Sequence, residues 1–188
     1  MLHGPLRVGD VEVVAVCEGV AALPLAAECP GAEVDWPAAR AEHAWAFTNP
    51  DRWPWHVHVF VLRTRSGVVL VDTGIGRLPP PSDTWAERYD GTAGLAAAGV
   101  EPQDVAHVVL THLHGDHAGG TVTGEGVPRF PNARYDVHPW DWVDFATDPD
   151  PDDRGNRLAM QALAEAGQLH LDPEDHVVAA GLRVVHTP

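Results

Sequence analysis

The chain has 188 residues, of which 45% are hydrophobic and 21% charged, so we expect one globular domain over residues 1–188. It carries 12 Lys+Arg against 27 Asp+Glu, a formal net charge of −15, and every basic residue is an arginine. A surface this acidic repels the phosphates of nucleic acids and anionic lipid headgroups, so neither is an expected partner.

The sequence also lacks membrane and secretion signals. No apolar run reaches the roughly 18 residues that a membrane-spanning helix needs, and the first residues contain no apolar signal region. The two cysteines, Cys17 and Cys29, have no CxxC spacing and form no disulfide framework. We therefore expect a cytoplasmic protein whose partner is a small-molecule substrate, and we leave a homodimer open.

Strand and helix patterns alternate along most of the chain. The hairpin signal is strong, because two valine-rich runs at 57–63 and 68–72 flank a turn. Residues 19–54 predict a long irregular segment, either a functional lid or a surface excursion held by its tryptophans. The other predicted elements are strands over 11–16, 105–111, 134–137, 177–179 and 182–185, and helices over 84–98, 140–145 and 157–166. This order predicts an α/β (α+β) fold with mixed β-sheets flanked by helices.

One histidine-rich segment stands apart from the rest. Residues 111–120 read T-H-L-H-G-D-H-A-G-G and follow an apolar strand directly. His112 and His114 are two residues apart, so in extended backbone they point the same way and can bind one ion. Gly115 permits a turn that directs Asp116 and His117 toward a second ion nearby.

The types of donor in this segment indicate the kind of metal. Imidazole nitrogens with a carboxylate suit zinc, iron, manganese or cobalt, and do not suit calcium or magnesium. Three histidines packed this tightly without a metal would repel one another when protonated, or waste buried polar groups when neutral. A solvent-exposed histidine-rich loop is the alternative, and the tight packing that Gly119 and Gly120 allow argues against it. We expect two divalent ions, with zinc first and iron, manganese or cobalt as alternatives.

The H-x-H-x-D-H pattern, after an apolar strand that ends in Thr111, resembles the metallo-β-lactamase-fold hydrolase superfamily. The V-D-T-G run at 71–74 is similar to a turn of that superfamily. Residues 95–120 and the F-P-N-A run at 130–133 extend the resemblance over most of 57–188. Within the superfamily, the chain resembles the lactonase and organophosphate-hydrolase-like branch. The resemblance implies a metallo-β-lactamase-like αβ/βα sandwich with a two-metal site at one edge of the sheets.

The resemblance also implies roles for individual residues. His112 and His114 would bind the first metal, and Asp116 and His117 the second, with Asp116 as the catalytic proton carrier. Asp72 matches an aspartate that supports the metal loop without binding metal. That role is physically sound, since a carboxylate hydrogen-bonded to a ligating imidazole fixes its tautomer. A simple turn former is the alternative for Asp72.

The implied activity is hydrolysis of an ester, lactone, thioester or similar bond by a hydroxide held between two metals. In the superfamily a further histidine ligand belongs to a T-P-G-H motif, whereas this sequence ends V-H-T-P. We therefore expect the second half of the fold to be incomplete here, and His186 does not match the ligand position. The alternative function is a non-catalytic metal-binding fragment that needs a longer chain or a partner to complete its site.

Weaker signals lie around the start of the hairpin. His56 and His58 alternate on one strand and would face the same side, where they line a substrate pocket, add to metal affinity, or form a half-buried strand face. Trp53 and Trp55 either wall an apolar substrate pocket or pack the core.

Overall fold

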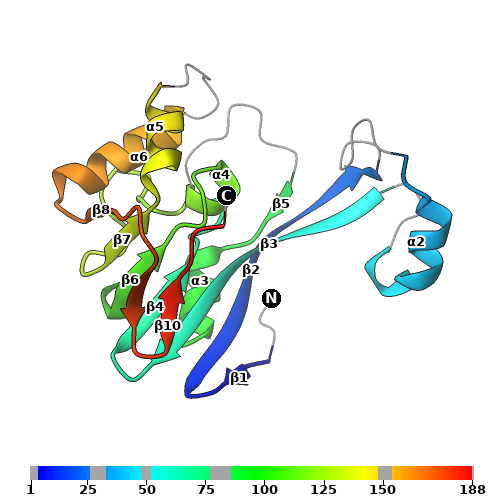
Figure 1. The fold of residues 1–188 in the computed structure, drawn as a ribbon, viewed down its shortest axis with the longest axis horizontal. Helices are drawn as coiled ribbons and strands as arrows, with labels where there is room; N and C mark the ends of the chain where they lie inside the picture. The colour runs from blue at the N-terminus through cyan, green and yellow to red at the C-terminus, as the bar shows by residue number, and fades with distance from the viewer. Residues whose placement is uncertain (1–3, 26–32, 48–51, 77–85, 148–153, 188) are drawn as a thin grey trace.

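The structure is a computed structural model that describes residues 4–25, 33–47, 52–76, 86–147 and 154–187 (Figure 1). Its main feature is a mixed sheet in the order β1-β2-β3-β4-β6-β7-β8, to which β5 adds by pairing with β2. The strands of this sheet are β1 (Leu6–Val8), β2 (Val11–Pro24), β3 (Arg52–Thr64), β4 (Gly67–Val71), β5 (Ala86–Arg88), β6 (Val105–Val109), β7 (Arg134–Val137) and β8 (Leu169–Leu171). A two-stranded sheet is formed by β9 (His176–Ala179) and β10 (Leu182–Val184).

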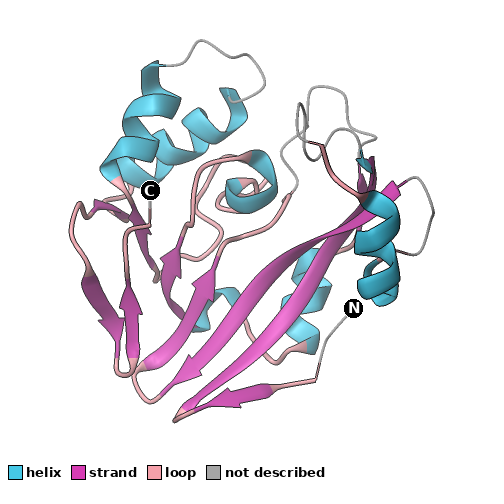
Figure 2. Cartoon of the chain, turned by 45° about the vertical axis from the view of Figure 1, so that its right-hand side comes forward, coloured by secondary structure: helices cyan, strands magenta, loops and turns pink. Residues whose placement is uncertain are grey.

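Helices lie around the sheet and at its two ends (Figures 1 and 2). In the views of both figures α5 and α6 lie together near β7 and β8, and α2 lies at the far end of the long β2–β3 ribbon. The helices are α2 (Trp36–Glu42), α3 (Gly91–Ala97), α4 (Gly115–Ala118), α5 (Pro139–Thr147) and α6 (Arg154–Glu165), with short 3₁₀ turns at Ala44–Ala46 and Pro102–Asp104. Among the described residues, no helix has the length and apolar character needed to cross a membrane.

The sheet changes from antiparallel to parallel at β4. The strands β1 to β4 pair antiparallel, whereas β4, β6, β7 and β8 run parallel. Parallel neighbours need a long crossover, which the segment containing α3 provides between β4 and β6. The carboxyl ends of β4, β6 and β7 therefore meet at one edge of the sheet, the place where α/β proteins gather functional side chains.

The core lies on one face of this sheet. Along β3 the side chains of Val57, Val59 and Val61 are at most 4% exposed, whereas Phe60 between them is 40% exposed on the opposite face. Period-two alternation of this kind is what a strand with one buried face requires. The fully buried Tyr135 of β7 and Met160 of α6 belong to the same core cluster.

A cavity of about 440 Å³ separates the other face from the small β9–β10 sheet. Its apolar wall is lined by residues such as Leu62, Val71 and Val109 of the main sheet and Leu182 and Val184 of β10. Toward the carboxyl edge the lining becomes polar and includes Thr111, just after the end of β6.

Two predicted segments differ from the structure. The segment 19–54 is not irregular throughout. Strand β2 continues to Pro24, which pairs with Arg52 at the start of β3, and α2 lies between the two strands in the chain. The predicted helix over 84–98 is shorter: residues 86–88 form β5, and α3 begins at Gly91, where the Asp90 side chain accepts from the backbone N–H groups of Thr92 and Ala93. Residues 84 and 85 lie outside the described residues. In both places pairing with β2 outweighs the local pattern.

Candidate metal centre

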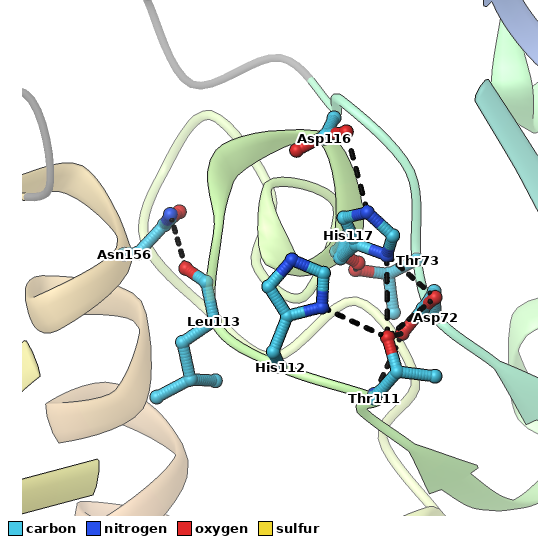
Figure 3. Close-up of polar contacts among 8 residues, drawn as sticks. All are labelled: Asp72, Thr73, Thr111, His112, Leu113, Asp116, His117 and Asn156. Atoms are coloured by element: carbon cyan, nitrogen blue, oxygen red, sulfur yellow. Dashed lines mark hydrogen bonds and ion pairs between the residues drawn. The ribbon is translucent and has the colours of Figure 1, made fainter. Parts of the chain in front are cut away.

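The histidine-rich motif lies at the carboxyl edge of the sheet, between the end of β6 and the short helix α4 (Figures 1 and 3). His112 and His114 belong to the extended connection, and His114 is the residue before the first turn of α4. Asp116 and His117 lie within that turn. Gly115 opens the helix, so the predicted change from extended backbone to a turn occurs at this position.

Two glycines after the motif allow α4 to pack against the V-D-T-G turn. A Cβ on Gly119 would lie 2.2 Å from the carbonyl oxygen of Ile75, and one on Gly120 would lie 2.1 Å from that of Thr73. Real Cβ atoms do not approach backbone this closely, so only glycine fits. The backbone N–H of Thr73 donates to the carbonyl of His117 at 2.7 Å, and its hydroxyl donates to the same oxygen at 2.9 Å. The turn thus holds the carboxyl-terminal end of α4.

Asp72 organises the centre of the motif from a buried position. Its Oδ1 accepts from the backbone N–H of Thr111 at 2.8 Å, and both of its oxygens accept from the Thr111 hydroxyl at 3.0 Å. Its Oδ2 lies 2.7 Å from Nδ1 of His117 (Figure 3). Asp72 also has a φ of 61°, a left-handed backbone conformation that aspartate tolerates better than most residues. The strand-end aspartate therefore contacts a motif histidine directly.

His117 lies between two carboxylates. Its Nδ1 faces Asp72 and its Nε2 is 3.3 Å from Oδ2 of Asp116. Burial disfavours the imidazolium, but the hydrogen bonds to Asp116 and Asp72 outweigh burial and raise the pKa of His117 to about 9. Burial likewise favours the neutral acid of Asp116, and the hydrogen bond from His117 outweighs it, so the pKa of Asp116 is lowered.

His112 is held by a different partner. Its Nδ1 is 3.1 Å from the Thr111 hydroxyl, whose proton is directed at Asp72, so His112 donates from Nδ1 and keeps a lone pair on Nε2. Burial, followed by the neighbouring imidazoles of His117 and His114, lowers the pKa of His112. His112 is therefore neutral at pH 7, the form that binds metals.

The donors fit divalent transition metals. Two ligands of one ion with bonds of about 2.1 Å lie roughly 3.0–3.4 Å apart, and the separation of 3.3 Å between His117 Nε2 and Asp116 Oδ2 matches. The ring centroid of His112 lies 4.7 Å from that of His114 and 3.9 Å from that of His117. In this conformation no three motif donors lie within 4.8 Å of one another; two groups elsewhere among the described residues do, and they are considered below.

The four residues predicted to line a substrate pocket lie on β3, away from the 440 Å³ cavity lining. Trp53 packs edge-on against Phe47, and Trp55 is 39% exposed. His56 and His58 stack with ring planes 13° apart. Their roles in substrate binding stay predictions.

Sequence reasoning missed three side chains around the centre. Asp141, on α5, lines the cavity beside Thr111, and burial raises its pKa while the nearby His112 lowers it. Asn156, buried on α6, donates from Nδ2 to the carbonyl of Leu113 at 2.8 Å and so fixes the backbone between His112 and His114 (Figure 3). Glu18 is buried under the V-D-T-G turn. Only tertiary contacts reveal these three, since none of them lies in a motif.

The comparisons with known proteins agree with this geometry. The family model described as "Metallo-beta-lactamase superfamily" matches residues 52–181, which is more than half of the chain. The chain belongs to the metallo-β-lactamase superfamily. The expected metallo-β-lactamase-like α/β fold is confirmed. No curated protein matches the sequence.

Solved structures of this superfamily share the fold at low sequence identity. A probable metal-dependent hydrolase from Staphylococcus aureus superposes with a TM-score of 0.76 at 21% identity, over 95% of this chain and 64% of that one. The dizinc quorum-quenching lactonase AidC, solved with the product N-hexanoyl-L-homoserine, gives a TM-score of 0.72 at 16% identity, over 90% and 60%. The hydrolase AbOPH gives 0.70 at 19% identity, over 89% and 60%. The chain thus spans less than two thirds of the length of these relatives.

Proposed function

We propose that this chain is a metal-dependent hydrolase that cleaves an ester, lactone, thioester or similar bond of a small molecule, with two divalent ions, preferably zinc, at the H-x-H-x-D-H motif. The observation that carries the proposal is the arrangement around His117. Asp72 accepts from its Nδ1, which directs Nε2 toward Asp116 as a second donor at 3.3 Å. A metal ligand held by a buried carboxylate is typical of metal sites in enzymes, because the carboxylate fixes the tautomer and raises basicity.

The protonation states of the motif residues determine their proposed roles. When bound, divalent ions supply Lewis acidity, which acidifies water and polarises the oxygen of the bond under attack. His112 offers a neutral Nε2, since Thr111 accepts its Nδ1 proton. Asp116 is ionised at neutral pH because its pKa is lowered. Its Oδ2 would bind metal beside Nε2 of His117, and its other oxygen, Oδ1, would accept a proton from the attacking water and return it to the leaving group. No covalent protein nucleophile is required.

The substrate class rests on the relatives. One of the solved structures with this fold is described as an N-acyl homoserine lactone lactonase, and another, a dizinc lactonase, is in complex with a product, N-hexanoyl-L-homoserine. A lactone is a neutral small molecule, and it suits a chain with a net charge of −15 better than a phosphate ester does. We therefore place lactones first among the esters to be tested.

A second candidate function is metal binding without catalysis. The observation that favours it is that no three motif donors lie within 4.8 Å of one another in this part of the described chain. In that case a longer chain or a partner supplies further ligands.

The test measures metal and activity separately. Metal content per chain is determined by plasma mass spectrometry on untagged protein, for the parent and for a variant that lacks all four motif donors (His112→Gln, His114→Gln, Asp116→Asn and His117→Gln). We expect the parent to hold about two ions more than this variant, and to hydrolyse γ-lactones or aryl esters. His43→Gln, an exposed histidine outside the motif, serves as the matched control. Motif-dependent metal without hydrolysis favours the second candidate, and metal content unchanged by the motif variant overturns both.

A further inference from the structure

A second group of transition-metal donors lies on the β2–β3 ribbon and contains none of the motif residues. The group consists of Cys17 on β2 and His56 and His58 on β3, and one donor atom from each lies within 4.8 Å of the other two. The Sγ atom of Cys17 is 3.9 Å from Nδ1 of His56. The two imidazole rings stack with planes 13° apart and centroids separated by 5.8 Å.

Cross-strand pairing brings these side chains together. Cys17 pairs with His58, but the register then shifts, so that Gly19 pairs with Val57 and Val20 with His56. Glu18 is the extra residue of this β-bulge. Directly opposed residues face the same side of a sheet, and side chains alternate along a strand, so Cys17, His58 and His56 share one face. The bulge that follows Cys17 also turns Val20 to this face.

The chemistry of the donors points to one class of ion. A cysteine thiolate with two imidazoles suits zinc, cobalt or copper(I) and does not suit calcium or magnesium. In a tetrahedral zinc site a sulfur and a nitrogen ligand lie about 3.6 Å apart and two nitrogens about 3.3 Å apart. The separation of 3.9 Å between Cys17 and His56 is close to the first value. Side-chain rotation alone can therefore close the group around an ion.

Burial is graded across the three residues. Cys17 is buried, 3% exposed, and its thiol donates to the carbonyl of Gly19 at 3.3 Å, while His58 is partly buried and His56 is exposed. An ion can thus enter from solvent past His56. Three protein ligands also leave a fourth position open to water, as in zinc sites that do chemistry.

We propose that Cys17, His56 and His58 form a separate binding site for a thiophilic divalent ion such as zinc. The ion ties β2 to β3 at the bulge and replaces the hydrogen bond from the thiol to Gly19, so that binding releases the thiol proton. The other group of three donors, Asp136, Asp172 and His176, is a weaker candidate because the guanidinium of Arg134 already pairs with both of its carboxylates.

Cobalt(II) bound to the Cys17 group should give a spectroscopic signal that cobalt(II) bound to the H-x-H-x-D-H motif cannot give. Thiolate bound to cobalt(II) produces an intense near-ultraviolet charge-transfer band, which imidazole and carboxylate ligands do not produce. We expect metal-free protein to develop this band when titrated with Co²⁺, with saturation at one equivalent of sulfur-bound metal. Added Zn²⁺ should displace the cobalt and abolish the band, since zinc binds such donors more tightly.

Substitutions distinguish metal binding at this site from metal binding at the H-x-H-x-D-H motif. Cys17→Ala should abolish the band, and His56→Gln/His58→Gln, which keeps the thiol, should weaken Co²⁺ binding at least tenfold. His112→Gln/His114→Gln should leave the band unchanged, as should Cys29→Ala, the control for the other cysteine. A circular dichroism spectrum checks that each variant is folded. No band in the parent, or a band that survives Cys17→Ala, overturns the proposal, and neither result bears on the proposed hydrolase activity.

Discussion

The Nδ1 atom of His117 lies 2.7 Å from Oδ2 of Asp72, although 45 residues separate them in the chain. This contact joins the end of β4 to the helix that follows β6, and the same carboxylate receives both the backbone N–H and the hydroxyl of Thr111. One buried side chain thus sets the orientation of His117 directly and that of His112 through Thr111. Its removal tests the whole arrangement.

Asp72→Asn should reduce metal affinity at the motif by about 10–100-fold, because the amide can no longer accept from Nδ1 of His117 with a charged oxygen. Asparagine tolerates the left-handed φ of 61° at this position, so the backbone is retained. Competition with a chromophoric chelator measures the affinity. Asp104→Asn, an exposed residue at a 3₁₀ turn, is the control. Equal affinities for Asp72→Asn and the parent would show that Asp72 is only a turn former.

The sequence predicted the strands that carry the site more accurately than those that frame it. The predicted strands over 57–63, 68–72 and 105–111 correspond to β3, β4 and β6 because each is a valine-rich run bounded by turn signals. The extension of β2 to Pro24 was missed, since Ala-Ala-Leu-Pro carries little strand propensity and is ordered by pairing with β3. β5 was missed for the same reason, as its pairing with β2 is a tertiary contact.

The candidate site likewise contains residues that the sequence could predict and residues that it could not. The motif residues could be predicted because three imidazoles and a carboxylate within six positions are themselves a metal-binding signature. The supporting residues could not, because Asn156 and Asp141 come from helices whose sequence patterns carry no metal signature and act only through packing beside the motif. The Cys17 group could not be predicted for a further reason: it depends on the register in which β2 pairs with β3, which no sequence motif specifies.

Gly119→Ala should destabilise the chain by about 2–3 kcal/mol and weaken metal binding at the motif. The new Cβ would lie 2.2 Å from the carbonyl oxygen of Ile75 and 2.3 Å from that of Gly115, so α4 must move. Gly124→Ala is the matched control, since a Cβ there meets nothing within 4 Å, and it should change stability by less than about 0.5 kcal/mol. Urea unfolding of both variants gives the comparison. Similar losses of stability in Gly119→Ala and Gly124→Ala would refute close packing at Gly119.

Glu18→Gln should flatten the dependence of stability on pH. Burial raises the pKa of Glu18 above 4.5 against the opposing guanidinium of Arg129, 3.8 Å away, and Oε1 has no hydrogen-bond partner among the described residues. A raised carboxyl pKa stabilises the fold fully below the unfolded value, and this contribution is lost as pH rises through the folded value. The free energy of unfolding of the parent should therefore fall over this range.

The glutamine variant has no carboxyl group at this position and should lose that part of the fall. Chemical unfolding at several pH values above 4.5 measures it, with Glu125→Gln, an exposed loop residue, as the control. A pH profile of Glu18→Gln that matches the parent would show that Glu18 has the same pKa in the folded and unfolded states.

Metal-free protein should contain one histidine that titrates near pH 9, and this histidine should be His117. Its folded pKa of about 9 exceeds the usual 6.5, so the imidazolium stabilises the fold fully below pH 6.5, and this contribution is lost as pH rises to about 9. NMR of the imidazole C–H groups measures the midpoint, and His117→Gln identifies the signal. Asp72→Asn should move the midpoint down, because one of the two carboxylates that hold the proton is gone. A midpoint near 6.5 in the parent would mean that His117 is not held between Asp72 and Asp116, and the arrangement proposed for the metal centre would fail with it.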